Sequence, residues 1–203
     1  MSGNRGRRYV LQVALIAGAY IAGALLGVAL ASSPSPVSLI WLPSGIGVSA
    51  VLLAGWRIWP AIALGATCST LIADAPLPVA VFVAVGATLE ALMAAVFTAR
   101  PFELRRDLDR IRDMVSLVAI ATLAPAVGAT IGAATRYVWG RAPLEAVGGE
   151  FLTWWAGDTF GILLLTPVLL TWHVRPPVEF RRWRIAEAVS LMVVLAWLSS
   201  LAF

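Results

Sequence analysis

Two isolated carboxylates lie within long apolar stretches of this chain. Asp158 ends the run Thr153-Trp154-Trp155-Ala156-Gly157-Asp158, and Glu90 is the single charged residue of residues 78–98. A carboxylate in the apolar part of a membrane helix costs about 2.5–3.5 kcal/mol on insertion scales unless a polar partner relieves that cost. We therefore expect both acids to face the protein interior, where they are candidates for binding a ligand or a partner side chain.

A third group of residues with chemical potential is the run Trp41-Leu42-Pro43-Ser44-Gly45. Proline frees a backbone carbonyl and glycine permits a bend, so irregular backbone here is expected to line a cavity. Tryptophan faces suit a flat or cationic apolar ligand, and Asp158 would supply the counter-charge. The candidate ligand-binding residues are three tryptophans, three further residues of the 41–45 run and the two acids: Trp41, Pro43, Ser44, Gly45, Glu90, Trp154, Trp155 and Asp158.

Simpler interpretations of the same residues remain open. Trp154 and Trp155 can form part of an aromatic belt at the membrane interface, and residues 43–45 can be a plain helix kink. Alternatively, each acid can form a buried pair that holds two helices together, with Arg136 as the candidate partner of Asp158. Gly157 and Gly161 are spaced four residues apart, which is typical of a helix that a neighbour approaches closely.

Known catalytic patterns are not found in the sequence. It contains no Ser-His-Asp set, no catalytic cysteine with a histidine, no phosphate-binding loop and no HExxH motif. The single histidine, His173, has no acid or cysteine at ligand spacing and makes a poor metal site. We therefore expect no catalytic residue, no metal, no cofactor and no enzyme activity in these 203 residues.

Composition defines the elements that must position these side chains. The chain is 60% hydrophobic and 13% charged, with a mean hydropathy of +0.88, which predicts an all-α, polytopic integral membrane bundle. We predict about seven spans, at residues 9–31, 37–55, 58–74, 78–98, 114–138, 151–172 and 187–203. The first resembles a secretory signal, but its apolar run exceeds the usual core of about 7–15 residues. Because Gly23 and Gly27 also suit helix packing, we interpret it as a retained span.

The basic residues predict the orientation. All but Arg136 and Arg141 of the 15 basic residues fall on one side of this topology, which the positive-inside rule assigns to the cytoplasm together with the N-terminus. Residues 100–113 predict a short amphipathic helix at that face, with a solvated loop as the alternative. Seven spans would leave the C-terminus outside, so we expect an eighth span to follow residue 203.

Several motifs in fixed order resemble a known family. They are Trp-Leu-Pro-Ser-Gly-Ile at 41–46, Trp-Arg-Ile-Trp-Pro at 56–60 with Gly65, Gly-Ala-Thr-Leu-Glu-Ala at 86–91, and residues 153–158 with Gly161 and Pro167. Together they resemble the bacterial membrane-associated sensor domain of the first described type (the MASE class). The resemblance implies a single integral sensor domain over residues 1–203, in the bacterial inner membrane. We expect the C-terminal output module of such a protein to lie outside these 203 residues.

The resemblance also implies a function and a set of partners. The domain would relay a signal to a cytoplasmic module, either a cyclic-di-GMP enzyme or a histidine kinase of a two-component system. Expected partners are the lipid bilayer, an unidentified small ligand, that signalling module in the same polypeptide or an associated protein, and a second copy in a homodimer. No nucleic acid is expected. The alternative is a small transporter or lipid-handling protein that uses Glu90 and Asp158, although the sequence lacks the internal repeat typical of transporters.

Overall fold

The computed structural model describes residues 2–29 and 40–174, and every regular element in those ranges is a helix. The α-helices are α1 (Ser2–Ala29), α2 (Leu42–Ala54), α3 (Trp59–Ile72), α4 (Leu77–Ala99), α5 (Ile111–Leu123), α6 (Pro125–Val138) and α7 (Val147–Val174). Short 3-10 helices occur at Trp56–Ile58 and Leu144–Ala146. The predicted all-α class is confirmed, whereas the predicted span at 187–203 and the arginines from Arg175 onward lie outside the described residues.

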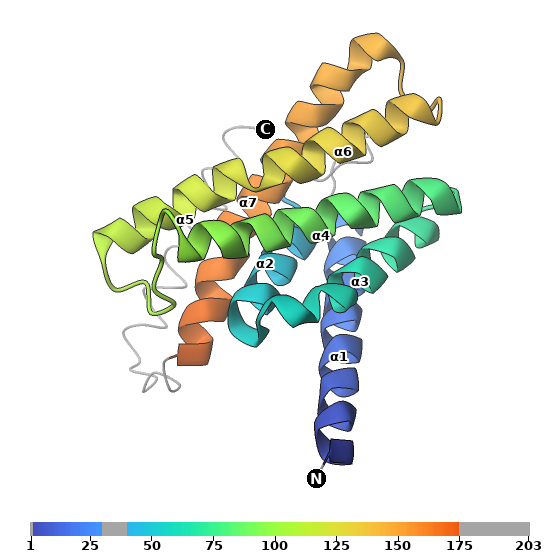
Figure 1. Cartoon of the computed structure of the whole chain (residues 1–203). Coiled ribbons are helices and arrows are strands. Elements are labelled where there is room, and N and C mark those ends of the chain that lie inside the picture. Colours follow the sequence, from blue (N-terminus) through green and yellow to red (C-terminus); the bar gives the residue numbers. More distant parts are fainter. Residues whose placement is uncertain (1, 30–39, 175–203) are drawn as a thin grey trace.

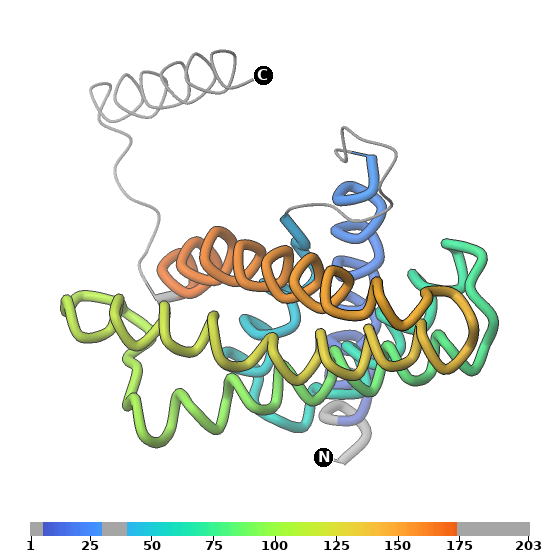
Figure 2. Tube along the Cα trace, turned by 90° about the horizontal axis from the view of Figure 1, so that it is seen from above, coloured from blue at the N-terminus to red at the C-terminus, as the bar shows by residue number. Residues whose placement is uncertain are grey.

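Helix length separates full spans from shorter elements. Within the described ranges, four stretches are long and apolar enough to cross a membrane: Gly6–Ala29, Leu77–Ala99, Ile111–Val138 and Leu144–His173. The third contains α5 and α6, which form one nearly continuous rod because Ala124 between them stays helical (Figures 1 and 2). By contrast, α2 and α3 have 13 and 14 residues, or about 20 Å each at 1.5 Å per residue. The predicted segments 37–55 and 58–74 are therefore shorter helices than a full span requires.

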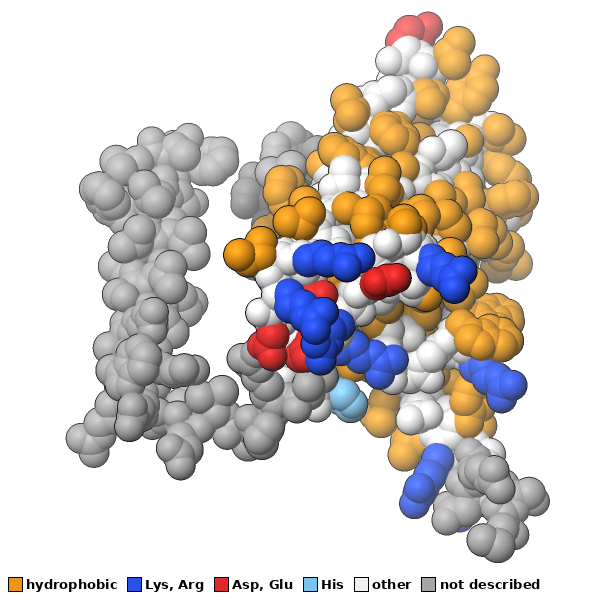
Figure 3. All heavy atoms as spheres, turned by 60° about the vertical axis from the view of Figure 1, so that its left-hand side comes forward, with side chains coloured by type: hydrophobic (Ala, Val, Ile, Leu, Met, Phe, Trp, Pro, Cys, Tyr) orange, Lys and Arg blue, Asp and Glu red, His pale blue; other side chains and the backbone are white. Residues whose placement is uncertain are grey.

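Helices α4, α5–α6 and α7 run back and forth between two ends of the bundle, and α1 crosses them (Figures 1 and 2). The end with the loop between α4 and α5 is called the arginine-rich end, because that loop carries the exposed side chains of Arg105 and Arg106. At the opposite end the Arg141 guanidinium, after α6, donates to the carbonyl of Asp74, after α3, at 3.4 Å. The Tyr9 hydroxyl of α1 donates to the carbonyl of Arg57, in the turn between α2 and α3, at 2.9 Å. Figure 3 shows charged side chains gathered at the arginine-rich end, apart from a largely hydrophobic surface.

The amphipathic helix predicted for residues 100–113 is wrong. Residues 100–110 form a loop between α4 and α5. The buried Asp113 carboxylate at the start of α5 accepts the backbone N–H groups of Arg105 at 3.2 Å and Arg110 at 3.3 Å. Leu104 turns into the hydrophobic core instead of lying along a surface stripe. A buried acid that binds loop N–H groups thus replaces the helical hydrogen bonds that the apolar spacing predicted.

Close contact of two backbones joins α2 to α7. A Cβ atom added to Gly161 would collide with the carbonyl of Trp41, and one added to Gly45 would collide with the carbonyl of Gly161. The Trp41 N–H donates to the Gly157 carbonyl at 2.9 Å, so the two helices also share a backbone hydrogen bond. Small residues permit such an approach because no side chain separates the helices. The close approach predicted for Gly157 and Gly161 is confirmed.

We predict that Gly161→Ala destabilises the bundle by about 1–3 kcal/mol, since the added methyl group overpacks the contact with α2. Gly149→Ala, in the first turn of the same helix, should have little effect because nothing lies within 4 Å of a Cβ atom there. The unfolding midpoints of the two variants, measured in detergent by heating and size-exclusion chromatography, check this. Equal midpoints for the two variants would show that α2 and α7 do not approach this closely.

Candidate ligand-binding cavity

A cavity of about 470 Å³ lies among α1, α2, α3, α4, α6 and α7. At the end opposite the arginine-rich end it is lined by Ala75, Arg136 and Arg141, and it reaches inward to Glu90 and Asp158. Most of the remaining lining is aliphatic or aromatic, including Tyr20, Ala24, Val28, Trp41, Ala66, Val79, Val83, Ala87 and Trp154. Its volume falls within the range of about 300–1,000 Å³ that small-molecule sites occupy.

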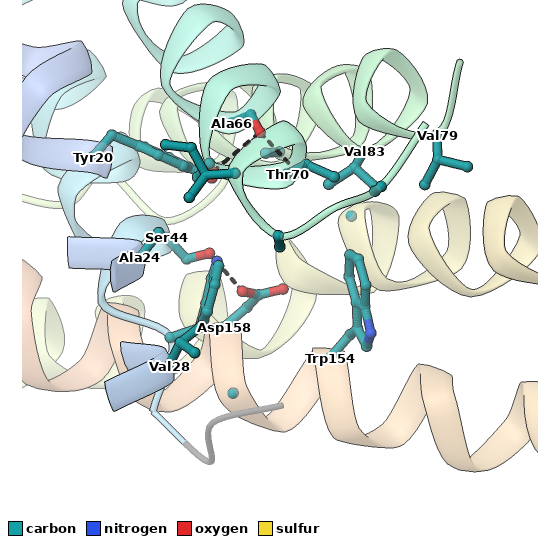
Figure 4. A pocket seen from close by; sticks show the side chains of 18 of the residues that line it. Tyr20, Ala24, Val28, Ser44, Ala66, Thr70, Val79, Val83, Trp154 and Asp158 are labelled. Carbon is teal, nitrogen blue, oxygen red and sulfur yellow. Dashed lines mark hydrogen bonds between the residues drawn. The ribbon is translucent and has the colours of Figure 1, made fainter. Parts of the chain in front are cut away.

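The two intramembrane acids meet at the inner part of this cavity. The Ser44 hydroxyl donates to a carboxylate oxygen of Asp158 at 2.6 Å, and Figure 4 shows the two side chains pointing toward each other. Glu90, from α4, lines the same cavity. Glu90 is 2% exposed and Asp158 is 6% exposed. The prediction that both carboxylates face the protein interior is confirmed.

The start of α2 contributes to the polarity of this region. Trp41 is the N-cap residue of α2, Pro43 lies in its first turn, and Ser44 follows directly. Pro43 therefore lies in the first turn of the helix, where a proline needs no N–H partner, and does not kink its interior. Because a helix N-terminus carries a partial positive charge, this first turn favours negative charge on the adjacent Asp158.

Glycines on neighbouring helices make room for the large side chains of the site. A Cβ atom at Gly128 of α6 would collide with the Glu90 carboxylate, and one at Gly132, a turn later, would collide with the Trp154 ring. A Cβ atom at Gly65 of α3 would likewise meet the Tyr20 ring. Each of these side chains is thus held against the bare backbone of another helix.

The structure brings together five of the eight predicted site residues: Trp41, Ser44, Glu90, Trp154 and Asp158 line the cavity. Pro43 and Gly45 are buried in α2 and do not line it. Trp155 also lies outside it, since its indole N–H donates to the Thr122 carbonyl of α5 at 2.8 Å. Sequence reasoning missed Tyr20, which is 3% exposed and lines the cavity from α1. The only signal for Tyr20 was a polar group within an apolar span.

The predicted pairing of Arg136 with Asp158 is wrong. Arg136 forms an ion pair with Glu150 at 2.9 Å. Arg136 lies in the last turn of α6 and Glu150 in the first turn of α7, so the adjoining helix ends bring them together. Asp158 lies eight residues further along α7, about 12 Å deeper at 1.5 Å per residue. Glu150 and Asp158 therefore lie at different depths along α7, and Arg136 pairs with Glu150, which is nearer the helix end.

Ser44→Ala should lower the free energy of unfolding by about 1.5–3 kcal/mol, because it removes the hydroxyl that donates to a buried carboxylate. Ser49→Ala is the matched control in the same helix. Ser49 is also buried, but its hydroxyl donates only to the Gly45 carbonyl of its own helix. The thermal unfolding midpoint measured in detergent should be lower for Ser44→Ala than for Ser49→Ala. The reverse order would contradict the Ser44–Asp158 hydrogen bond.

Among known protein families, the MASE1 family matches residues 12–203 of this chain. No curated protein and no solved structure matches the chain. The family match covers nearly all of the chain, including every helix that lines the cavity. It agrees with the apolar helices and with the motif order that the sequence showed. The chain therefore belongs to the MASE1 family and is a membrane sensor domain.

Proposed function

We propose that this domain senses a small ligand within its transmembrane bundle and relays the signal to a cytoplasmic signalling module. The module would be a cyclic-di-GMP enzyme or a histidine kinase, in the same polypeptide or in an associated protein. The observation that carries the proposal is the cavity itself. It is a roomy apolar space with two buried carboxylates at its inner part, in a domain whose family is a sensor family.

The arrangement of α7 supports a route for the signal. Asp158 lies in the cavity near the N-terminal part of α7, and the helix continues to Val174 near the arginine-rich end (Figure 1). Ligand contacts with Ser44 and Asp158 would act on the junction between α2 and α7. A ligand can shift a two-state equilibrium only by its differential affinity for the two states, so a few kcal/mol of preference is enough to switch the domain.

The proposed topology has the N-terminus in the cytoplasm and the domain in the bacterial inner membrane. In this arrangement the arginine-rich end faces the cytoplasm, in accordance with the positive-inside rule. The four helical stretches that are long enough to cross the membrane would form the embedded bundle together with the shorter α2 and α3. A homodimer would bring two such domains and their signalling modules together.

In the full-length protein, Asp158→Asn and Glu90→Gln should each abolish signalling or lock it in one state while leaving membrane insertion intact. Both substitutions remove a carboxyl group from the cavity but keep the side-chain volume. Glu145→Gln, at an exposed carboxylate outside the cavity, is the matched control. The readout is the product of the signalling module in membranes, normalised to the amount of inserted protein. Normal responses from both cavity variants would leave the carboxylates with a packing role only.

Reporter fusions test the orientation. Alkaline phosphatase fused after Arg141 should be active because that residue lies at the end proposed to face the periplasm. The same enzyme fused after Arg106 should be inactive, and green fluorescent protein should be fluorescent there. Phosphatase activity at Arg106 would reverse the proposed topology.

A further inference from the structure

We propose that the ligand of this cavity is an organic cation, with its charged group beside Glu90 and Asp158 and an apolar body in the remaining volume. This inference rests on the proposed function, because it names the chemical class of the ligand that the sensor would bind. It is argued from the charge, the aromatic surface and the size of the cavity.

Neither of the two acids at the inner part of the cavity pairs with a basic side chain of the described lining. Among the described residues that line it, the basic side chains are Arg136 and Arg141. Arg136 forms its ion pair with Glu150, and Arg141 donates to the carbonyl of Asp74. Neither arginine therefore serves as the partner of the two acids. The hydroxyl of Ser44 and the first turn of α2 stabilise one negative charge, which leaves a second carboxylate that a cation can satisfy.

The walls beside the acids are aromatic. Tyr20 of α1, Trp41 at the N-cap of α2 and Trp154 of α7 all line the same cavity. A cation within about 6 Å of an aromatic ring centroid is attracted by the negative face of the ring, and aromatic cages recognise quaternary ammonium groups in this way. Aromatic faces next to carboxylates thus favour a soft, weakly hydrated cation over a strongly hydrated one.

The size of the cavity and its donor set favour an organic ion over a metal. The described residues contain no group of three or more His, Cys, Asp or Glu side chains that could hold a metal. A hard cation such as Ca²⁺ needs roughly six to eight oxygen ligands, and alanines and valines make up much of this lining. An apolar body attached to the cation would fill that aliphatic part of the cavity.

Three probes with the same benzyl group but different charge test the inference. They are benzyltrimethylammonium, the neutral benzyl methyl sulfone and the anion phenylmethanesulfonate. Isothermal titration calorimetry on the purified protein in detergent should show that the cation binds at least about tenfold more tightly than the neutral probe. The anion should bind more weakly than either.

Substitutions test whether the two acids cause the preference for the cationic probe. Asp158→Asn and Glu90→Gln should each weaken cation binding by at least about tenfold and leave binding of the neutral probe unchanged, which also shows that the cavity is intact. Glu145→Gln is the control that should change neither. Trp154→Leu keeps both acids and should weaken binding of the cation several-fold more than binding of the neutral probe. This variant tests the inference even if an acid variant fails to fold.

The inference is overturned if the cation binds no better than the neutral probe, or if its preference survives both acid substitutions. Signalling that depends on Glu90 and Asp158 without a cation preference would mean that the acids hold only a proton or another ligand. The proposed function would then stand and the ligand class would be wrong. A cation preference that has no effect on signalling would instead keep the binding site and refute the sensor role.

Discussion

The junction of α2 with α7 is the contact on which the rest of the structure depends. Gly45 and Gly161 allow the two backbones to meet, and the Trp41 N–H donates to the Gly157 carbonyl beside them. This close approach brings the Ser44 hydroxyl within 2.6 Å of Asp158. A larger residue at either glycine would move α2 away from α7, and the hydroxyl could no longer reach the acid. The Ser44–Asp158 hydrogen bond therefore depends on the close packing of α2 against α7.

The same principle operates across the bundle because lipid offers no hydrophobic gain for bringing two helices together. Helices must instead gain van der Waals contact and hydrogen bonds from close approach. Gly128 and Gly132 of α6 show how this is used, since each leaves the space that a site side chain occupies. Bare backbone surfaces thus serve both as packing faces and as the receptors for Glu90 and Trp154.

Much of this could be predicted from the sequence, and the limits have physical causes. Unbroken apolar runs predicted the helices, and the cost of burying charge predicted that Glu90 and Asp158 face inward. The pairing of Arg136 was wrong because depth along α7 decides which acid it reaches, and two helix ends had to be placed to know that. The loop at 100–110 was misjudged because its apolar residues pack inward from an irregular backbone. Tyr20 was missed because its role depends on the position of Gly65 in another helix.

The separation of the site residues along the chain has a consequence for assembly. Ser44 and Asp158 are 114 positions apart, and Glu90 lies between them in sequence. Because synthesis begins at the N-terminus, α4 reaches the translocation machinery before α7 has been made. Glu90 must then enter the bilayer before Asp158 has been made, although Tyr20 and Ser44 of the same cavity are already synthesised. A ribosome that pauses before α7 would hold an unfinished bundle whose acid is not yet enclosed, which is the stage at which a membrane chaperone or protease would recognise the nascent protein.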